Sequence, residues 1–327
     1  MTAHPYDALQ PDTVLDAVES QGYRCSGQLL GLNSYENRVY QIGIEDAPPL
    51  IAKFYRPQRW SDAAILEEHA FGFELDDREI PVVPPLKNAE EKSLFEHAGF
   101  RFALFRRQGG RAPELDNEEN LRWLGRFLAR IHAVGKIERY RHRPRLDIET
   151  FGRAPQRIVQ ESGMLAEYLK QPYKTITDLL LQRVEIAFDM VQPLKLLRLH
   201  GDCHPGNILW TEHGPHFVDL DDSRMGPAVQ DLWMLLNGEA EERQIQLGWM
   251  LEGYREFCDF DPTELMLIEP LRSLRLIHYA GWLASRWSDP AFPRNFPWFN
   301  TPRYWEEHIQ TLQEQLARMD EPTMRVY

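Results

Sequence analysis

The loop at 200–207 and the hairpin expected after it constrain the fold more than any other part of the chain. The segment LRLHGDCHPGNILW ends in a short apolar strand pattern, and HFVDL at 216–220 is a second one. The residues TEHGP between them favour a turn. In an antiparallel hairpin the start of the first strand lies near the end of the second. We therefore expect Asn207 and Asp219 to lie side by side.

A metal site is one interpretation of the polar residues in this loop. Zinc is bound by Cys and His side chains, usually from more than one segment. The loop offers four candidate ligands, namely His200, Asp202, Cys203 and His204. Adjacent residues such as Cys203 and His204 seldom reach one tetrahedral ion, and the three cysteines form no second Cys/His cluster. The zinc interpretation is therefore the weaker one.

A phosphotransferase loop is the stronger interpretation. Its pattern is H-x-D, four residues and then Asn, which the chain has as HGDCHPGN. Asp202 would meet the hydroxyl that attacks the γ-phosphate of ATP, while Asn207 and Asp219 would hold Mg²⁺, a cation that prefers oxygen ligands. Ordinary loop polarity explains Asp202 alone equally well, but the three residues together favour catalysis.

The remaining polar residues near the loop have plainer expectations. His200 is expected to orient the loop, His204 to stabilise local structure, and Cys203 to be a small packed thiol. Asp221 and Asp222 either extend the acidic metal site or are surface carboxylates, and the second interpretation is favoured.

The N-terminal third of the chain predicts a small sheet. A helix is expected at 12–19, two strands joined by a polar turn at 28–44, a break at EDAPP, a third strand at 50–55, a helix at 61–76 that begins after Ser61, and a strand at 99–105. The Gly-containing segment RRQGGR that follows predicts the boundary between two lobes.

The same part of the chain must hold the triphosphate without a known glycine-rich motif, since GxxxxGK[ST] and GxGxxG are both absent. Ser34 and the backbone N–H groups of 33–37 could cradle phosphate. Lys53 would pair with phosphate from the middle of its strand. Glu68, preferred over Glu67, would pair with Lys53. An exposed strand lysine and a solvated helix face are the competing interpretations.

The C-terminal part predicts helices. Leu124, Phe127, Leu128 and Ile131 recur at helical spacing, and this helix is expected to begin with a capping box of Asp116 and Glu119 and to end at Gly135. Further helices are expected at 154–170, 174–191, 229–237, 240–257, 263–287 and 303–319. The prediction is an α+β chain with a small N-terminal antiparallel-sheet lobe, 1–107, and a larger, mainly helical C-terminal lobe, 108–327.

The net charge and the cysteine content limit the classes of partner and the cellular compartment that we expect. The net charge of −13 disfavours nucleic acid and anionic membranes. No stretch is apolar enough to span a membrane, and the N-terminus has no apolar core of a signal peptide. Three sparse cysteines indicate a reducing compartment. We expect a cytoplasmic monomer.

HGDCHPGN followed by FVD resembles the protein-kinase-like phosphotransferases, a family that includes aminoglycoside, choline and homoserine kinases. Over almost the whole chain, longer segments are similar to the bacterial stress-response protein kinases of this family. These segments are LNSYENRVYQ, KFYRPQRW, ILEEHAF, GPAVQDLWMLLNG and DPAFPRNFPW. The resemblance implies a two-lobed protein-kinase-like fold. It also implies a cytosolic ATP- and Mg²⁺-dependent serine/threonine protein kinase that counters stress-induced cell death.

The resemblance also implies roles for single residues. Asp202 becomes the proton acceptor, and Asn207 and Asp219 become Mg²⁺ ligands, with Asp219 also essential for transfer. Ser34 contacts ATP, and Lys53 and Glu68 form the pair that positions its phosphates. The last role concerns Asp231, in VQDLW, which buttresses the catalytic loop.

Departures from ordinary protein kinases keep other functions open. Asp219 is followed by Leu-Asp rather than Phe-Gly, no APE motif follows, and only nine residues separate Asp219 from Val229. The acceptor is expected to be a Ser/Thr hydroxyl of a protein, the kinase itself included. A small-molecule hydroxyl is the alternative, bound by aromatic residues of 278–287 and 292–299 that otherwise belong to the core. A nucleotide-binding scaffold without turnover is disfavoured by the intact set of polar residues.

Overall fold

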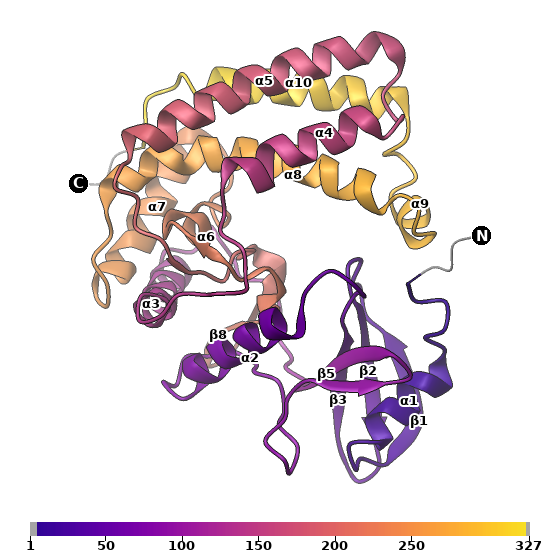
Figure 1. Cartoon of the computed structure of the whole chain (residues 1–327). Coiled ribbons are helices and arrows are strands. Elements are labelled where there is room, and N and C mark those ends of the chain that lie inside the picture. Colours follow the sequence, from indigo (N-terminus) through magenta and orange to yellow (C-terminus); the bar gives the residue numbers. More distant parts are fainter. Residues whose placement is uncertain (1–4, 325–327) are drawn as a thin grey trace.

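A computed structural model describes residues 5–324, which form two lobes (Figure 1). Within these residues the N-terminal lobe has a five-stranded antiparallel sheet in the order β1-β2-β3-β5-β4. Its elements are α1 (Pro11–Glu19), β1 (Cys25–Gly31), β2 (Arg38–Ile44), β3 (Ala47–Phe54), α2 (Asp62–Asp76), β4 (Phe95–His97) and β5 (Phe100–Arg106).

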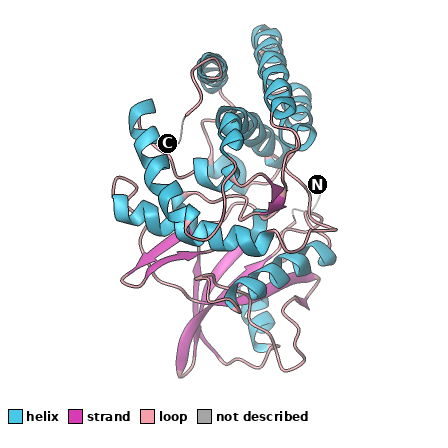
Figure 2. Cartoon of the chain, turned by 90° about the vertical axis from the view of Figure 1, so that its left-hand side faces the viewer, coloured by secondary structure: helices cyan, strands magenta, loops and turns pink. Residues whose placement is uncertain are grey.

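The C-terminal lobe is mainly helical, and Figure 2 shows its helices gathered at the opposite end of the molecule from the sheet. Its helices are α3 (Glu118–Gly135), α4 (Ala154–Glu161), α5 (Glu167–Met190), α6 (Val229–Trp233), α7 (Ala240–Arg255), α8 (Ile268–Arg286), α9 (Ala291–Asn295) and α10 (Pro302–Arg318). Its short strands are β6 (Leu197–Arg198), β7 (Ile208–Thr211), β8 (Gly214–Phe217) and β9 (Met225–Gly226). The predicted α+β, two-lobed fold is confirmed.

Each lobe has its own apolar core. In the sheet lobe, Phe54 and Phe102 stack with ring centroids 5.2 Å apart, and α1 covers this core with buried valines. In the helical lobe, the predicted stripe on α3 packs against α7, and its leucines and isoleucine are fully buried. Phe127 is only half-buried beside them. The helical spacing therefore identified the buried face of α3.

Helix starts follow side-chain caps, and one prediction about them is wrong. Ser61 caps α2 as expected, because its Oγ accepts from the N–H of Ala64 at 3.2 Å. The cap of α3 is Asn117 rather than Asp116, since the Asn117 side chain accepts from the N–H of Asn120. The expected capping box is absent there, because the helix begins one residue later than the pattern suggested.

Several element boundaries also differ from expectation. The expected helix 154–170 is divided at 162–166, where Gly163 takes a left-handed φ of +72° that ends α4. Strand β3 begins at Ala47 rather than at 50, because Glu45 and Asp46 make a tight turn and an irregular register between Ile42 and Ile44 accommodates the two prolines. The segment expected at 263–287 starts with a 3-10 turn before α8, and the Pro-rich loop expected at 292–299 contains α9.

No helix among residues 5–324 combines the length and the apolarity needed to cross a membrane.

Candidate active site

A buried ion cluster at the cleft surrounds Lys53 of β3. Its Nζ lies 2.8 Å from Asp219 Oδ1, 3.2 Å from Asp221 Oδ1 and 3.8 Å from Glu68 Oε1. Burial alone would lower the pKa of Lys53, but the three carboxylates raise it well above its ordinary value. The lysine is therefore a permanent cation at the floor of the cleft, where a phosphate group would find it.

The two glutamates of α2 have separate roles. Glu68 lies beside Lys53 and also 3.3 Å from Nη1 of Arg143. Glu67 faces away, and its carboxylate accepts from the backbone N–H groups of 141–143 at 2.7–3.0 Å. Burial raises the pKa of Glu68 to about 7 in spite of Lys53 and Arg143. The structure thus places Glu68, and not Glu67, in the ion cluster.

The interpretation of Asp221 as a surface carboxylate is wrong. Only 3% of Asp221 is exposed, and its carboxylate pairs with both Lys53 and Arg59. Burial opposes ionisation, but Arg59 and Lys53 hold the pKa of Asp221 below its usual value. Asp222 is half-buried between Arg59 and Arg224. No local pattern separates Asp221 from an exposed aspartate, because its partners Lys53 and Arg59 come from segments distant in the sequence.

The predicted hairpin sets Asn207 against the residue before Asp219. Strands β7 and β8 pair from Ile208 with Phe217, and the N–H of Val218 donates to the carbonyl oxygen of Asn207 at 3.0 Å. Strand β8 ends at Phe217, not at 220 as expected. The chain turns there because Asp219 takes a left-handed conformation, φ 62° and ψ 68°. Such a backbone is uncommon outside glycine and is often found at functional sites.

Asp231 of α6 fixes the backbone of the loop that precedes the hairpin. Its two carboxylate oxygens accept from the N–H groups of His200 and Gly201 at 2.8 and 2.9 Å, and His132 of α3 lies 3.1 Å away. Gly201 must be glycine, since its φ is +88° and a Cβ would lie 2.2 Å from the carbonyl oxygen of Asp222. The backbone of the HGD segment is therefore fixed from two sides.

The histidines and the cysteine of this loop behave as local structure. His200 is buried, and its Nε2 lies 2.9 Å from the carbonyl oxygen of Val218, which joins the loop to the hairpin. His204 Nδ1 accepts from the N–H of Gly206, and the Cys203 thiol is fully buried. Among residues 5–324 no group of three or more His, Cys, Asp or Glu side chains has the arrangement of a metal site.

Asp202 emerges from the rigid loop beside α8. Its Oδ1 accepts from Nη1 of Arg275 at 2.8 Å, and its Oδ2 lies 3.5 Å from Nε2 of His204. A quarter of the Asp202 side chain is exposed. The carboxylate is thus oriented by an arginine that the sequence pattern did not indicate, and it remains within reach of an incoming hydroxyl.

Between the lobes lies a cavity of about 340 Å³. Five of the predicted residues line it, namely Ser34, Lys53, Glu68, Asn207 and Asp219. Ile51, Phe105 and Leu209 give it apolar walls on both sides. Ser34 Oγ donates to the carbonyl oxygen of Asn37 at 3.2 Å. The hydroxyl that was expected to contact ATP therefore stabilises the turn at 33–37. The cavity has the size and mixed lining of a small-molecule site.

The oxygens of Asn207 and Asp219 suit a hard cation. Asn207 donates from Nδ2 to the backbone oxygen of Asp202, which directs this amide and leaves its Oδ1 for a ligand. Asp219 is half-exposed at the cavity, with Lys53 on one oxygen. Because Mg²⁺ takes only one or two protein carboxylates and completes its shell with water and phosphate oxygens, these two residues are a sufficient protein share.

A second group of residues, unexpected from the sequence, joins the lobes in front of the cavity. Glu36, in the turn between β1 and β2, accepts from Nε1 of Trp282 at 2.6 Å and from Nη2 of Arg286 at 2.8 Å. Arg56, after β3, donates to Asp289 at 2.7 Å. We call these five residues the inter-lobe clasp. Four of the five are charged and Trp282 is not, and a separation of more than 200 residues hides the pairing.

Comparison with known proteins identifies the family. Residues 29–268 match the model described as "Phosphotransferase enzyme family", which is well over half of the chain. The chain belongs to the phosphotransferase enzyme family. The prediction of an ATP-dependent phosphotransferase is thereby confirmed. The polar residues expected for this activity line the cavity between the lobes.

Two relatives of this phosphotransferase cover nearly all of it. It is 44% identical over 325 residues to "Stress response kinase A" of Escherichia coli O157:H7, with 99% of the chain and 98% of the relative covered. It is 43% identical over 324 residues to "Serine/threonine protein kinase RdoA" of Salmonella typhimurium, with the same coverage.

Two solved structures share the fold of this phosphotransferase. A microcompartment-associated aminopropanol kinase matches with a TM-score of 0.70 at 17% identity, covering 95% of this chain and 99% of that one. Amicoumacin kinase, in complex with AMP-PNP and Ca²⁺, matches with a TM-score of 0.67 at 20% identity, covering 92% and 94%.

The support given by Asp231 leads to a stability prediction for this phosphotransferase. We expect Asp231→Asn to lower the free energy of unfolding by about 2–3 kcal/mol, because an amide cannot accept from both N–H groups and His132. Burial raises the pKa of Asp231, but the hydrogen bonds from His132 and Gly201 outweigh burial and hold this pKa below its usual value. The carboxylate's contribution is therefore present above about pH 4 and lost as the pH falls.

Urea denaturation at pH 7 and at pH 3.5 measures both parts of this expectation. The exposed Asp259→Asn is the matched control, because it removes the same charge without a buried hydrogen bond. An Asp231→Asn protein as stable as wild type at pH 7, or a deficit that grows toward low pH, would contradict the assigned support.

Proposed function

We propose that this phosphotransferase is a serine/threonine protein kinase that uses Mg²⁺ and ATP, acts in the cytoplasm and belongs to a stress response. The observation that carries the proposal is the convergence of Lys53, Asn207 and Asp219 on one cavity, with Asp202 beyond it on a rigid loop. The names of the two curated relatives support the protein acceptor and the stress role.

Each residue has a separate task in the proposed reaction. Lys53, held by Glu68, pairs with the ATP phosphates, and the turn that contains Ser34 covers them. Asn207 and Asp219 hold Mg²⁺, which neutralises charge on the transferring group. Asp202 accepts the proton of the attacking Ser or Thr hydroxyl. Positioning and electrostatic stabilisation supply most of the rate in such reactions, so the fixed loop and the buried ion cluster suit this chemistry.

A small-molecule acceptor is the second candidate, and the short segment after Asp219 favours it. This segment makes a 3-10 turn and β9 and then enters α6, so it offers no long platform for a peptide. The aromatic residues expected to line such an acceptor site are divided. Phe292 and Phe299 are buried in the core, whereas Tyr279 and Trp298 are about 40% exposed. The structural relatives named above are small-molecule kinases by their descriptions.

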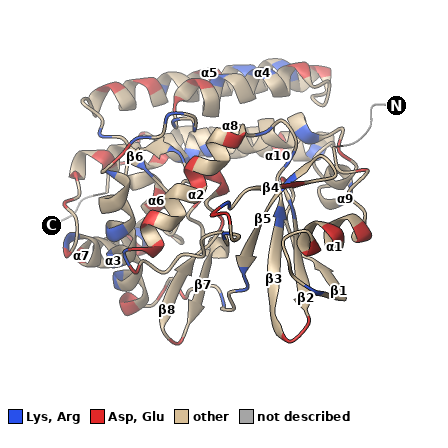
Figure 3. Cartoon of the chain, turned by 60° about the horizontal axis from the view of Figure 1, so that its bottom comes forward, with Lys and Arg blue, Asp and Glu red and all other residues tan. Residues whose placement is uncertain are grey.

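The distribution of charge bears on other partners. Acidic and basic residues are interspersed over both lobes in Figure 3 rather than gathered on one face. A duplex or an anionic membrane would select a basic stripe. We therefore propose a protein acceptor and no nucleic-acid or membrane partner, and we expect the kinase to be a monomer.

Transfer of labelled γ-phosphate from Mg-ATP tests the acceptor class. The acceptors are the kinase itself, a generic basic protein, and a panel of choline, homoserine and aminoglycosides. We expect label on protein serine or threonine. Label on a small alcohol alone would overturn the protein-kinase proposal in favour of the second candidate. If no acceptor carries label, the acceptor of this phosphotransferase belongs to neither class, and both proposals are wrong.

Arg275 gives a further expectation about this reaction. It holds Asp202 through one charge-assisted hydrogen bond, so Arg275→Ala should lower kcat about tenfold by loosening the carboxylate. Because Arg275 is absent from the lining of the nucleotide cavity, KM for ATP should be unchanged. Arg275→Lys, which keeps the charge, should recover part of the rate. A rise in KM for ATP together with a lower unfolding temperature would point instead to a general defect in folding.

A further inference from the structure

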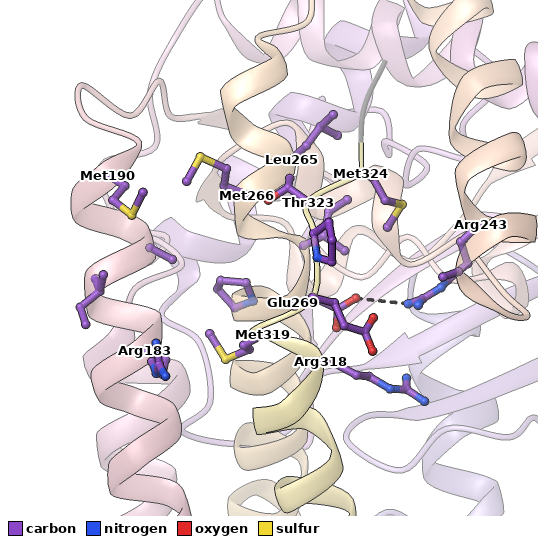
Figure 4. A pocket seen from close by; sticks show the side chains of 17 residues that line it. Arg183, Met190, Arg243, Leu265, Met266, Glu269, Arg318, Met319, Thr323 and Met324 are labelled. Atoms are coloured by element: carbon purple, nitrogen blue, oxygen red, sulfur yellow. Dashed lines mark hydrogen bonds and ion pairs between the residues drawn. The ribbon is translucent and has the colours of Figure 1, made fainter. Parts of the chain in front are cut away.

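A cavity of about 280 Å³ lies in the helical lobe, apart from the nucleotide cleft (Figure 4). It is bounded by the end of α5, the segment before α8, the first turn of α8, and the chain from the end of α10 to Met324. None of the residues that line the nucleotide cavity lines this one. Its volume lies just below the range of about 300–1,000 Å³ common for small-molecule sites, so an occupant would be small.

One side of this cavity carries more guanidinium groups than carboxylates to match them. Glu269, in the first turn of α8, accepts from Arg243 at 3.2 Å, from Arg272 at 3.2 Å and from Gln315 at 2.8 Å. Burial lowers the pKa of Arg272, and the nearby Arg243 and Arg318 lower it further against Glu269. A single carboxylate therefore pairs with two arginines, while Arg318 adds a third positive charge nearby.

The hydrogen bonding of these arginines is incomplete. Nε of Arg243 and Nη2 of Arg272 are buried and have no hydrogen-bond partner within residues 5–324. Arg318 lines the cavity and forms no ion pair with any described residue. The other charged residues of the rim are Arg183, which pairs with Asp320, and the exposed Glu321. Buried donors without acceptors are costly, so an anion placed in the cavity beside Arg243 and Arg318 would be stabilised.

The opposite side of the cavity is apolar and adaptable. It is lined by Met190, Met266, Met319 and Met324, together with Ile186 and Leu265. Met190 is 64% exposed and Ile186 is 49% exposed, so this wall presents apolar surface to an occupant. Methionine side chains are flexible and fit varied apolar shapes. An occupant with a short apolar body would cover both exposed residues.

We propose that this cavity is a binding site for a small carboxylate with an apolar tail, of the size of a medium-chain fatty acid. The carboxylate lies beside Arg243 and Arg318, which both line the cavity, and the tail lies along the methionines. Guanidinium groups bind carboxylates through paired, charge-assisted hydrogen bonds, which fixes the headgroup end. The site is independent of the proposed acceptor class, because it neither contacts nor includes the catalytic residues.

Isothermal titration of the full-length protein with octanoate tests the proposal, with octan-1-ol and octylamine as matched ligands. Octanoate should bind at a ratio of one to one, and more tightly than the alcohol or the amine by about tenfold, the effect of one charge-assisted contact. Binding should persist when Mg²⁺ and ADP saturate the nucleotide cleft. Equal binding of the three ligands, no binding of octanoate, or its displacement by ADP would overturn the proposal.

Two variants locate the binding. Arg318→Gln should weaken octanoate binding about tenfold, and Met190→Glu, which adds a carboxylate to the apolar wall at an exposed position, should abolish it. The control is Arg303→Gln, which removes the same charge from the other end of α10 at an 86% exposed side chain. Unfolding temperatures show that each variant is folded. Wild-type affinity in Arg318→Gln would exclude this cavity as the site.

Discussion

Asp202→Ala should reduce phosphoryl transfer by at least about a thousandfold while leaving the protein folded. A positioned proton acceptor contributes about 10²–10⁴ in rate, and no second carboxylate can replace Asp202, since Asp219 and Asp221 are paired with Lys53 in the cleft. Folding should survive because the Asp202 side chain is partly exposed and its carboxylate bonds only to surface-accessible Arg275 and His204. Single-turnover transfer of labelled phosphate measures the rate.

Binding of ATP separates a chemical defect from a structural one in this variant. The dissociation constant for Mg-ATP should be close to that of wild type, because Asp202 is absent from the lining of the nucleotide cavity. Asp202→Asn should lose nearly as much rate, since it keeps the shape but not the proton acceptor. Near-normal turnover in either variant would refute the assignment of the loop.

Lys53→Met should have the second largest effect, and it should act on both rate and stability. Without the ammonium group, Asp219, Asp221 and Glu68 remain close together around an apolar side chain. Removing one partner from a buried ion cluster costs about 3–5 kcal/mol. Transfer should fall by at least about a thousandfold, because the same group is proposed to position the ATP phosphates.

Urea denaturation of Lys53→Met at several pH values tests the electrostatic cause. The loss of stability should shrink as the pH falls from about 7 toward 4, because protonation of the carboxylates, beginning with Glu68, whose pKa burial already raises to about 7, removes their mutual repulsion. Lys87→Met is the matched control, because Lys87 lies at the surface with an exposed partner, Glu91, and should change stability by less than about 1 kcal/mol. A pH-independent deficit would show that packing, and not charge, causes the loss.

The local parts of the site could be predicted from the sequence. Asn207 and Asp219 are brought together by a hairpin whose two strands and turn are adjacent in the chain, so strand pattern and turn residues were enough. Lys53 and Glu68 lie on neighbouring elements, β3 and α2, so the helix after the strand could be expected to supply the partner, and the family resemblance agreed. The helical face of α3 was predictable because periodicity records burial directly.

The distant parts could not be predicted. Asp221 was misjudged because its partner Arg59 is 162 residues away in the chain, and nothing in the sequence FVDLDD distinguishes a buried aspartate from an exposed one. Arg275, which orients Asp202, lies 73 residues beyond it on a helix whose rotation is set by packing. The start of α3 depends on Asn117 and the end of α4 on Gly163. The spacing of apolar residues contains no information about such single capping and left-handed positions.

The inter-lobe clasp connects two functions through one helix. Helix α8 presents Trp282 and Arg286 to Glu36 in the nucleotide turn, and the same helix presents Arg275 to Asp202. An acceptor that displaces Arg275 would therefore act on the helix that also holds the turn proposed to cover ATP. Coupling of this kind is reciprocal, so whatever an acceptor does to the affinity for ATP, ATP must do by the same factor to the affinity for the acceptor.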